Sequence, residues 1–252
     1  MNWMLEPQLW VAFITLFALE LVLGVDNVIF ISILAGKLPT TLQHRARVIG
    51  LSLAVVSRLI LLLFLSSIIR LTEPLFSIFN FDVSGRDIIV IVGGLFLIGK
   101  ATHEIHDKLE GEEGHASTRA KPTFSSFLVQ VLLLDMIFSL DSVITAVGMV
   151  DRIEIMTAAI VIAAGVMIFS SGPLSAFVER HPTIKMLALA FLLLIGFTLI
   201  VEGLHQHIPK GYIYFAMAFS LFVEFLNLRL RKTGVPVKLH EAYISEENEG
   251  AK

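Results

Sequence analysis

Two carboxylates and an amide interrupt a long apolar run in Glu20-Leu-Val-Leu-Gly-Val-Asp26-Asn27-Val-Ile. The run extends from Leu9 to Leu34, which exceeds the roughly 20 residues that a helix needs to cross a bilayer. A carboxylate near the middle of a membrane costs roughly 3 kcal/mol on insertion scales. We therefore predict a membrane-spanning helix whose acids have a function.

The same pattern returns half a chain later as Asp135-Met-Ile-Phe-Ser-Leu-Asp141-Ser142-Val-Ile. Each copy has an acid, five residues, an aspartate, a small polar residue and Val-Ile, which predicts a duplicated membrane unit. Four such acids together cost on the order of 10 kcal/mol unless ions, protons or water compensate their charge. We expect the duplicated motif to bind something positive.

The composition is that of a membrane protein, with 56% hydrophobic and only 16% charged residues in a chain of 252. The chain has no cysteine, which excludes thiolate sites for Cu(I) or zinc. The net charge of -3 is too small to suggest a nucleic-acid partner. The N-terminus lacks the basic region and cleavage site of a signal peptide, so we expect the first apolar run to remain in the protein.

We predict an all-α polytopic membrane protein with seven transmembrane helices, because seven segments are long and apolar enough. The predicted spans are residues 9–34, 48–69, 88–105, 124–150, 155–177, 184–202 and 212–228. They divide the chain into a first three-helix repeat (1–105), a cytoplasmic linker (106–122), a second three-helix repeat (123–204), a seventh transmembrane helix (205–230) and a cytoplasmic tail (231–252).

Each repeat has an odd number of crossings, so the second must begin on the opposite side of the membrane and the two are inverted repeats. Lysine and arginine set the orientation, because they concentrate in cytoplasmic loops. With the N-terminus outside, the outer loops hold only Arg70, Arg86, Arg152 and Lys210. We therefore predict an outside N-terminus and a cytoplasmic C-terminus.

The two motifs predict a cation site at the middle of the membrane. Residues six apart lie about 240° around and about 9 Å along a regular helix, so Glu20 and Asp26 cannot share one ion without a local break, which we expect at Gly24. If the first and fourth helices are adjacent, the acids of both motifs converge. The predicted ligands are Glu20, Asp26, Asn27, Asp135, Asp141 and Ser142, with Thr145 as a further neutral oxygen. Such an all-oxygen shell suits Mn²⁺, Ca²⁺ or Mg²⁺.

A structural interpretation competes with this one. Arg58 lies in the middle of the second predicted helix and can pair with the acids, either as a fixed partner or as a moving counter-ion. Lys100 lies near a helix end, where it can reach water or act in gating. The acidic and histidine-rich run from His103 to His115 can collect cations or can simply be a solvated loop. No motif for covalent catalysis is present, so we do not expect an enzyme.

The chain resembles the TerC family of integral membrane proteins, which is named for tellurite resistance and is related to the LysE exporters. The resemblance rests on both acid motifs, on the glycine pair Gly93-Gly94 with the Leu-Phe-Leu-Ile that follows, and on Lys100-Ala-x-x-Glu-Ile-His106. It implies a multi-spanning exporter of divalent metal, manganese above all, with the intramembrane acids as ligands. The link to tellurite resistance would then be indirect, since carboxylates bind an anion poorly.

The expected function is efflux of Mn²⁺ as the transported ion across a bacterial cytoplasmic membrane, with coupling to protons, while Ca²⁺ and Mg²⁺ stay open as cargo. One alternative is a membrane scaffold or stress-resistance factor that transports nothing, and another is a proton or sodium pathway through the same acids. The expected partners are metal ions and the lipid bilayer, with no nucleic acid. A homodimer or a membrane-protein partner stays open.

Overall fold

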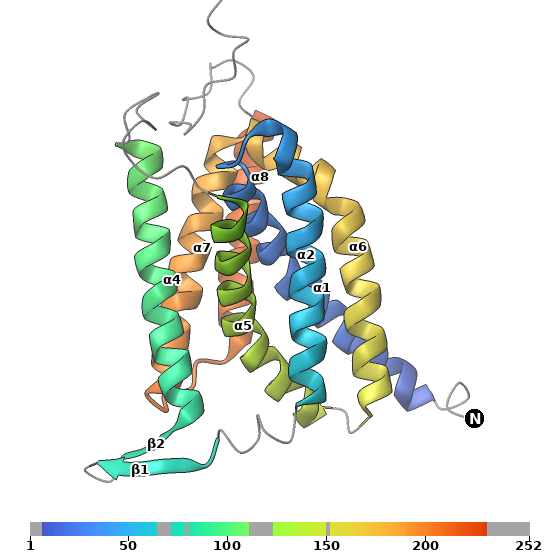
Figure 1. Cartoon of the computed structure of the whole chain (residues 1–252), viewed down its shortest axis with the longest axis vertical. Coiled ribbons are helices and arrows are strands. Elements are labelled where there is room, and N and C mark those ends of the chain that lie inside the picture. Colours follow the sequence, from blue (N-terminus) through green and yellow to red (C-terminus); the bar gives the residue numbers. More distant parts are fainter. Residues whose placement is uncertain (1–6, 65–71, 79–80, 111–122, 150–151, 231–252) are drawn as a thin grey trace, which may run out of the picture.

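The structure, a computed structural model, describes residues 7–64, 72–78, 81–110, 123–149 and 152–230. Long helices packed side by side dominate it (Figure 1). They are α1 (Pro7–Ala35), α2 (Thr40–Leu63), α4 (Gly85–Leu109), α5 (Phe124–Met149), α6 (Ile153–Arg180), α7 (Pro182–Gly203) and α8 (Lys210–Leu230). In the described part of the chain, six of them are long and apolar enough to cross a membrane, and α5 adds a shorter apolar segment from Phe124 to Leu140.

In the described part of the chain a helix lies in each of the seven predicted segments, in the predicted order and with differences at the ends. α2 begins at Thr40, directly after Pro39, and so includes two polar turns that hydropathy alone assigned to a loop. α4 continues to Leu109, so the linker predicted from residue 106 begins later. The predicted span ends at residues 69 and 150, and most of the linker, lie outside the described residues.

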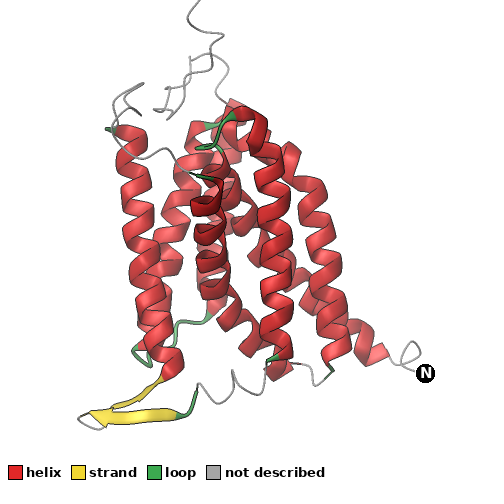
Figure 2. Ribbon diagram, viewed as in Figure 1, coloured by secondary structure: helices red, strands yellow, loops and turns green. Residues whose placement is uncertain are grey.

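A β-hairpin between α2 and α4 was not predicted. Its strands β1 (Pro74–Ile78) and β2 (Phe81–Ser84) are antiparallel, with Pro74 opposite Ser84 and Ser77 opposite Asp82. Figure 2 shows the hairpin projecting from the end of the bundle where the N-terminus lies. β2 leads straight into α4 because Ser84 and Asp87 form a reciprocal capping box at the first turn of the helix.

The predicted break at Gly24 is wrong, because α1 is one helix from Pro7 to Ala35. The glycine instead allows a close approach of α6. A Cβ atom on Gly24 would collide with the thioether sulfur of Met167. The small residue is therefore explained by helix packing, which is a common use of glycine between membrane helices.

The tightest crossing joins α4 and α7. A Cβ atom on Gly94 would lie 2.5 Å from the carbonyl oxygen of Gly196, and one on Gly196 would lie 2.9 Å from the carbonyl oxygen of Gly94. The same reciprocity extends to Ile200 beside Gly94 and Ile98 beside Gly196. Backbones this close leave no room for any side chain, which explains the glycines in both helices.

α1, α2, α5 and α6 form a second packed group. α1 packs mainly on α6, and α2 packs on both α5 and α6, while α1 also contacts α5. α8 packs against α7 at the edge of the bundle and carries exposed phenylalanines, including Phe215 and Phe222. The interior between α1, α2, α5 and α6 is where the duplicated motifs lie.

Candidate functional site

Arg58 of α2 is the centre of a polar cluster inside the bundle. Its side chain forms an ion pair with Glu20 of α1 through Nη1 and Oε2, and a second with Asp135 of α5, where Nη2 lies 3.3 Å from Oδ1. The three residues are each no more than 4% exposed. The arginine thus joins the leading acids of the two motif copies.

Two serines complete the cluster. Ser57 donates a hydrogen bond to Oδ2 of Asp135, and the Nε of Arg58 donates one of 3.0 Å to the hydroxyl of Ser139, which is fully buried. The sequence order explains this arrangement, because Ser57 is the neighbour of Arg58 and Ser139 follows Asp135 by one helical turn. The guanidinium and the carboxylate of Asp135 are therefore each held by more than one partner.

The charges of this cluster do not balance. Glu20 and Asp135 together carry two negative charges when ionised, and Arg58 supplies one positive charge. Removing one partner from a buried ion pair typically costs about 3–5 kcal/mol because the other charge is left without compensation. Among the described residues of the cluster, one more positive charge, from a proton or from a metal ion, would balance the two ionised acids.

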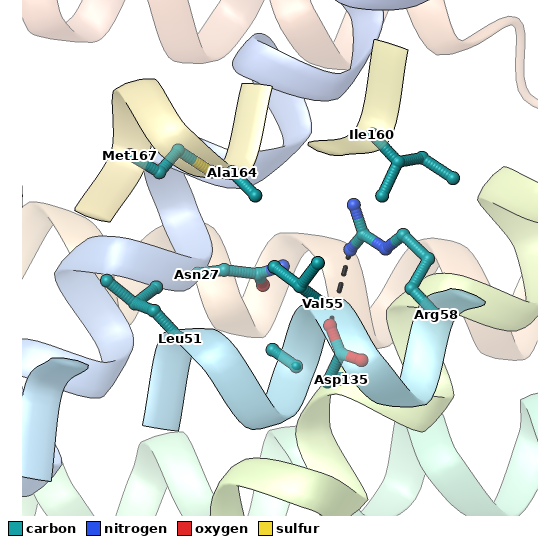
Figure 3. A pocket seen from close by; sticks show the side chains of 9 residues that line it. Asn27, Leu51, Val55, Arg58, Asp135, Ile160, Ala164 and Met167 are labelled. Atoms are coloured by element: carbon teal, nitrogen blue, oxygen red, sulfur yellow. Dashed lines mark hydrogen bonds and ion pairs between the residues drawn. The ribbon is translucent and has the colours of Figure 1, made fainter. Parts of the chain in front are cut away.

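A small cavity lies beside the ion pairs (Figure 3). It is lined by Asn27, Leu51, Ala54, Val55, Arg58, Asp135, Ile160, Ala164 and Met167. The cavity has a volume of about 20 Å³, which holds roughly one water or one bare ion. Figure 3 shows Asn27 of α1, Asp135 of α5 and Met167 of α6 around it, with the dashed Arg58–Asp135 pair at one side.

The structure thus brings together three of the six predicted ligands, Glu20, Asn27 and Asp135, at or beside one guanidinium. Asp26 lies in α1, and Asp141 and Ser142 lie in α5. The positions of their side chains are outside the described part of the structure. Among the residues that are described, no group of three or more His, Asp or Glu is close enough to hold a metal ion. Arg58 lies between Glu20 and Asp135 where a cation would bind both.

Lys100 belongs to another cluster, at the end of α4. Its Nζ lies 2.9 Å from Oε1 of Glu104, and Nζ of Lys37 lies 2.6 Å from the same atom. Glu104 is fully buried, so the two lysines neutralise a carboxylate that ties α4 to the connection between α1 and α2. The described contacts place Lys100 with Glu104 and not with the predicted ligands.

The predicted cation-collecting run from His103 to His115 is only partly described. His103 lies 3.5 Å from Asp107 on the same face of α4, and residues 111–122 lie outside the described residues. At the other end of the bundle, His205 lies 3.0 Å from Asp87. The first contact lies within α4 and the second joins α4 to a residue just beyond the end of α7, and neither belongs to a metal-binding group among the described residues.

Three residues of the site were missed by sequence reasoning. Ser57, Ser139 and Met167 were not predicted as site residues, because the first two are small polar residues and the third is one more apolar residue of its helix. The position of Ser139 within the second motif was a usable signal, since it is one turn from Asp135. Met167 had no signal, because its place at the cavity depends on how α6 packs against Gly24.

A family comparison agrees with this architecture. The model of the integral membrane protein TerC family matches residues 5–235. The chain belongs to the TerC family. A UPF0053 protein of Haemophilus influenzae is 51% identical over 92% of this chain and 98% of its own length. The UPF0053 inner membrane protein YgdQ of Escherichia coli K12 is 56% identical over 90% of this chain and 95% of its own length.

Another TerC-family relative is longer. The UPF0053 inner membrane protein YoaE of Escherichia coli K12 is 48% identical over 92% of this chain, which spans 45% of that relative. No solved structure gives a significant match. The relatives named as inner membrane proteins and the apolar helices together identify this TerC-family chain as a multi-pass protein of the cell membrane.

Proposed function

We propose that this TerC-family protein exports divalent cations, Mn²⁺ above all, across the cytoplasmic membrane. The observation that carries the proposal is the burial of Glu20 and Asp135, from the two motif copies, at one guanidinium inside the bundle. Ionisable residues within membrane helices generally mark ion or proton pathways. The carboxylates and the amide of Asn27 are oxygen donors of the kind that Mn²⁺, Ca²⁺ and Mg²⁺ accept.

In this proposal Arg58 is a tethered cation that alternates with the metal. When no metal is bound, its guanidinium occupies the space between Glu20 and Asp135 and keeps the buried acids compensated. A divalent ion that enters the adjacent cavity displaces the guanidinium from Asp135. The ion is then held by Asp135 and Asn27, with Asp26 and Asp141 as further candidates from the same motifs.

We also propose that α1, α2 and α4 form one inverted repeat and α5, α6 and α7 the other. Exchange of the repeats would turn the α1–α6 contact into the α5–α2 contact, and both pairs pack extensively. The same exchange would interchange α4 and α7, so that their contact would map onto itself. Gly94 and Gly196 approach each other reciprocally at this contact. This pattern is expected from an axis in the membrane plane.

The proposed orientation has the N-terminus outside and the C-terminus in the cytoplasm. Figure 1 shows the connection between α1 and α2 at the same end of the bundle as the end of α4 and the end of α8. This end carries Lys37 and Lys100 at Glu104 and the basic residues of the connections. An excess of lysine and arginine is typical of the cytoplasmic side.

Export of a divalent cation against an inside-negative potential needs a source of energy. It costs about 4.6 kcal/mol per 100 mV, which is twice the cost of about 2.3 kcal/mol for one elementary charge. Exchange of one Mn²⁺ for two protons moves no net charge. Acids that accept either a metal or protons suit this exchange, so we propose proton coupling through the same cluster.

The scaffold interpretation has support from one observation, namely that Arg58 pairs with both acids at once. A purely structural cluster and a transport site differ in their response to metal. A ligand that binds the folded protein stabilises it by about 2.7 kcal/mol at one hundred times its Kd. The transport proposal expects a saturable rise in unfolding temperature with Mn²⁺, and the scaffold interpretation expects none.

The proposal is tested in cells by measuring manganese content. Cells that express the native chain should hold less manganese after a Mn²⁺ load than cells that express Asp135→Asn. The control is Asp107→Asn, which removes a carboxylate from the end of α4 that contacts Lys37 at 3.7 Å and lies away from the cluster. Equal manganese contents with native protein and Asp135→Asn, at equal amounts in the membrane, would refute export through this site.

A further inference from the structure

Met167 is the one side chain at the cavity that offers sulfur. It lines the cavity together with Asn27 and Asp135, and its sulfur meets the face of α1 at Gly24. Figure 3 shows Met167 of α6 above Asn27, among the side chains that line the cavity. Three helices thus bring three different donor types to one small space: an amide, a carboxylate and a thioether.

The mixture matters because metal ions differ in the ligands they accept. Mg²⁺ and Ca²⁺ take oxygen ligands almost exclusively. Thioether and thiolate ligands are soft and favour the softer transition metals, while oxygen ligands suit Mn²⁺ as well as the alkaline-earth ions, so a thioether adds a contact that Mg²⁺ and Ca²⁺ use least. The chain has no cysteine, so methionine is its only source of a sulfur ligand. A cavity with a volume of about 20 Å³ also leaves little room for the waters that Mg²⁺ usually keeps.

The sulfur of Met167 can pack against α1 because residue 24 is a glycine. Any side chain at residue 24 would occupy the volume of the thioether. The glycine of the first motif therefore leaves room for the side chain of Met167, whereas the second motif has Ser139 at the same place, where it accepts a hydrogen bond from Arg58. The two motif copies have different partners at this position.

We propose that Met167 is the selectivity residue of the cation site, which prefers divalent transition-metal ions over Mg²⁺ and Ca²⁺ through its thioether. The inference rests on the proposed function, since it concerns the same cavity. Asp135 and Asn27 bind the ion through oxygen, and Met167 adds the one contact that Ca²⁺ and Mg²⁺ cannot use well. Leucine at this position keeps the size and apolar character of the side chain but removes the donor.

The test compares metal binding by the full-length purified protein and by Met167→Leu, with Mn²⁺, Cd²⁺, Ca²⁺ and Mg²⁺ as probes in equilibrium dialysis. We expect the substitution to weaken binding of Mn²⁺ and Cd²⁺ by about tenfold or more, comparable to the effect of removing a supporting partner at a metal site. Binding of Ca²⁺ should stay the same or improve. Met156→Leu is the control, because Met156 is a buried methionine of the same helix outside the cavity.

A spectroscopic measurement on the native protein does not depend on the variant folding. X-ray absorption at the cadmium edge should show sulfur among the nearest neighbours of bound Cd²⁺, and Met167→Leu should lose that signal. Only oxygen and nitrogen neighbours, or an equal change in affinity for all four ions, would overturn the role of Met167. If the native protein binds none of the four ions, the proposed function fails together with this inference.

Discussion

Replacing Arg58 by methionine tests the arrangement of the cluster most sharply. The substitution keeps a long side chain but removes the charge that Glu20 and Asp135 share. In the described part of the chain, both carboxylates are then buried without a basic partner. Removing one partner of a buried pair costs about 3–5 kcal/mol, and for a protein of this size 1 kcal/mol corresponds to about 2–4 °C in unfolding temperature. We expect Arg58→Met to lower the unfolding temperature by about 6–20 °C in metal-free buffer.

Added Mn²⁺ should reverse much of this loss. In the variant a divalent ion can occupy the place of the guanidinium, whereas in the native protein the ion must first displace the guanidinium. Stabilisation by about 2.7 kcal/mol is expected at one hundred times the Kd, so the rise in unfolding temperature with Mn²⁺ should be larger in Arg58→Met than in the native protein. The assay is thermal unfolding of purified protein in detergent, over a series of Mn²⁺ concentrations.

Lys100→Met is the matched control. It removes a charge from another buried pair, but Glu104 keeps Lys37 at 2.6 Å, so the expected loss is smaller and Mn²⁺ should not restore it. Two results would refute the reasoning. The first is an unfolding temperature of Arg58→Met equal to that of the native protein. The second is a Mn²⁺ effect no larger in Arg58→Met than in the native chain.

Two further predictions follow from the helices that carry and support the site. Asp26→Asn and Asp141→Asn should abolish Mn²⁺ export while the amount of folded protein in the membrane stays near the native level, because each change removes a costly intramembrane charge. Membrane fractions and manganese content check this, and normal export by either variant would exclude that carboxylate as a ligand. Gly94→Ala should lower stability by about 1–3 kcal/mol, since its Cβ would lie 2.5 Å from the Gly196 oxygen. Gly99→Ala, with nothing within 4 Å of the new atom, should be neutral or stabilising by up to about 1 kcal/mol, and equal losses in both variants would refute the close crossing.

The membrane architecture could be predicted from the sequence because long apolar runs, and acids within them, can be recognised from the order of the residues alone. The meeting of Glu20 and Asp135 was expected from the duplication, and Arg58 was recognised as a possible partner because a charge inside an apolar run needs compensation. The family assignment rested on the same residues and on Gly93-Gly94, and it is confirmed.

Other features depend on contacts between segments far apart in the chain. Gly24 was interpreted as a helix breaker, but its actual constraint is the sulfur of Met167 on α6, which no local pattern indicates. The β-hairpin was missed because Leu75-Phe76-Ser77-Ile78 is too short to distinguish a strand from a turn. The early start of α2 was missed because a hydropathy criterion finds the span in the membrane and not the polar turns before it.

Mn²⁺ flux in proteoliposomes, recorded together with the internal pH, tests the central claim most directly. The claim is that this TerC-family protein moves Mn²⁺ through the Glu20–Arg58–Asp135 cluster in exchange for protons. It predicts that native protein carries Mn²⁺ out of the vesicles, that a proton gradient directed inward accelerates the efflux, and that the compartment the metal leaves becomes more acidic. Asp135→Asn should show none of these effects. An absence of Mn²⁺ flux with native protein, or a flux that follows only sodium or the membrane voltage, would contradict the claim.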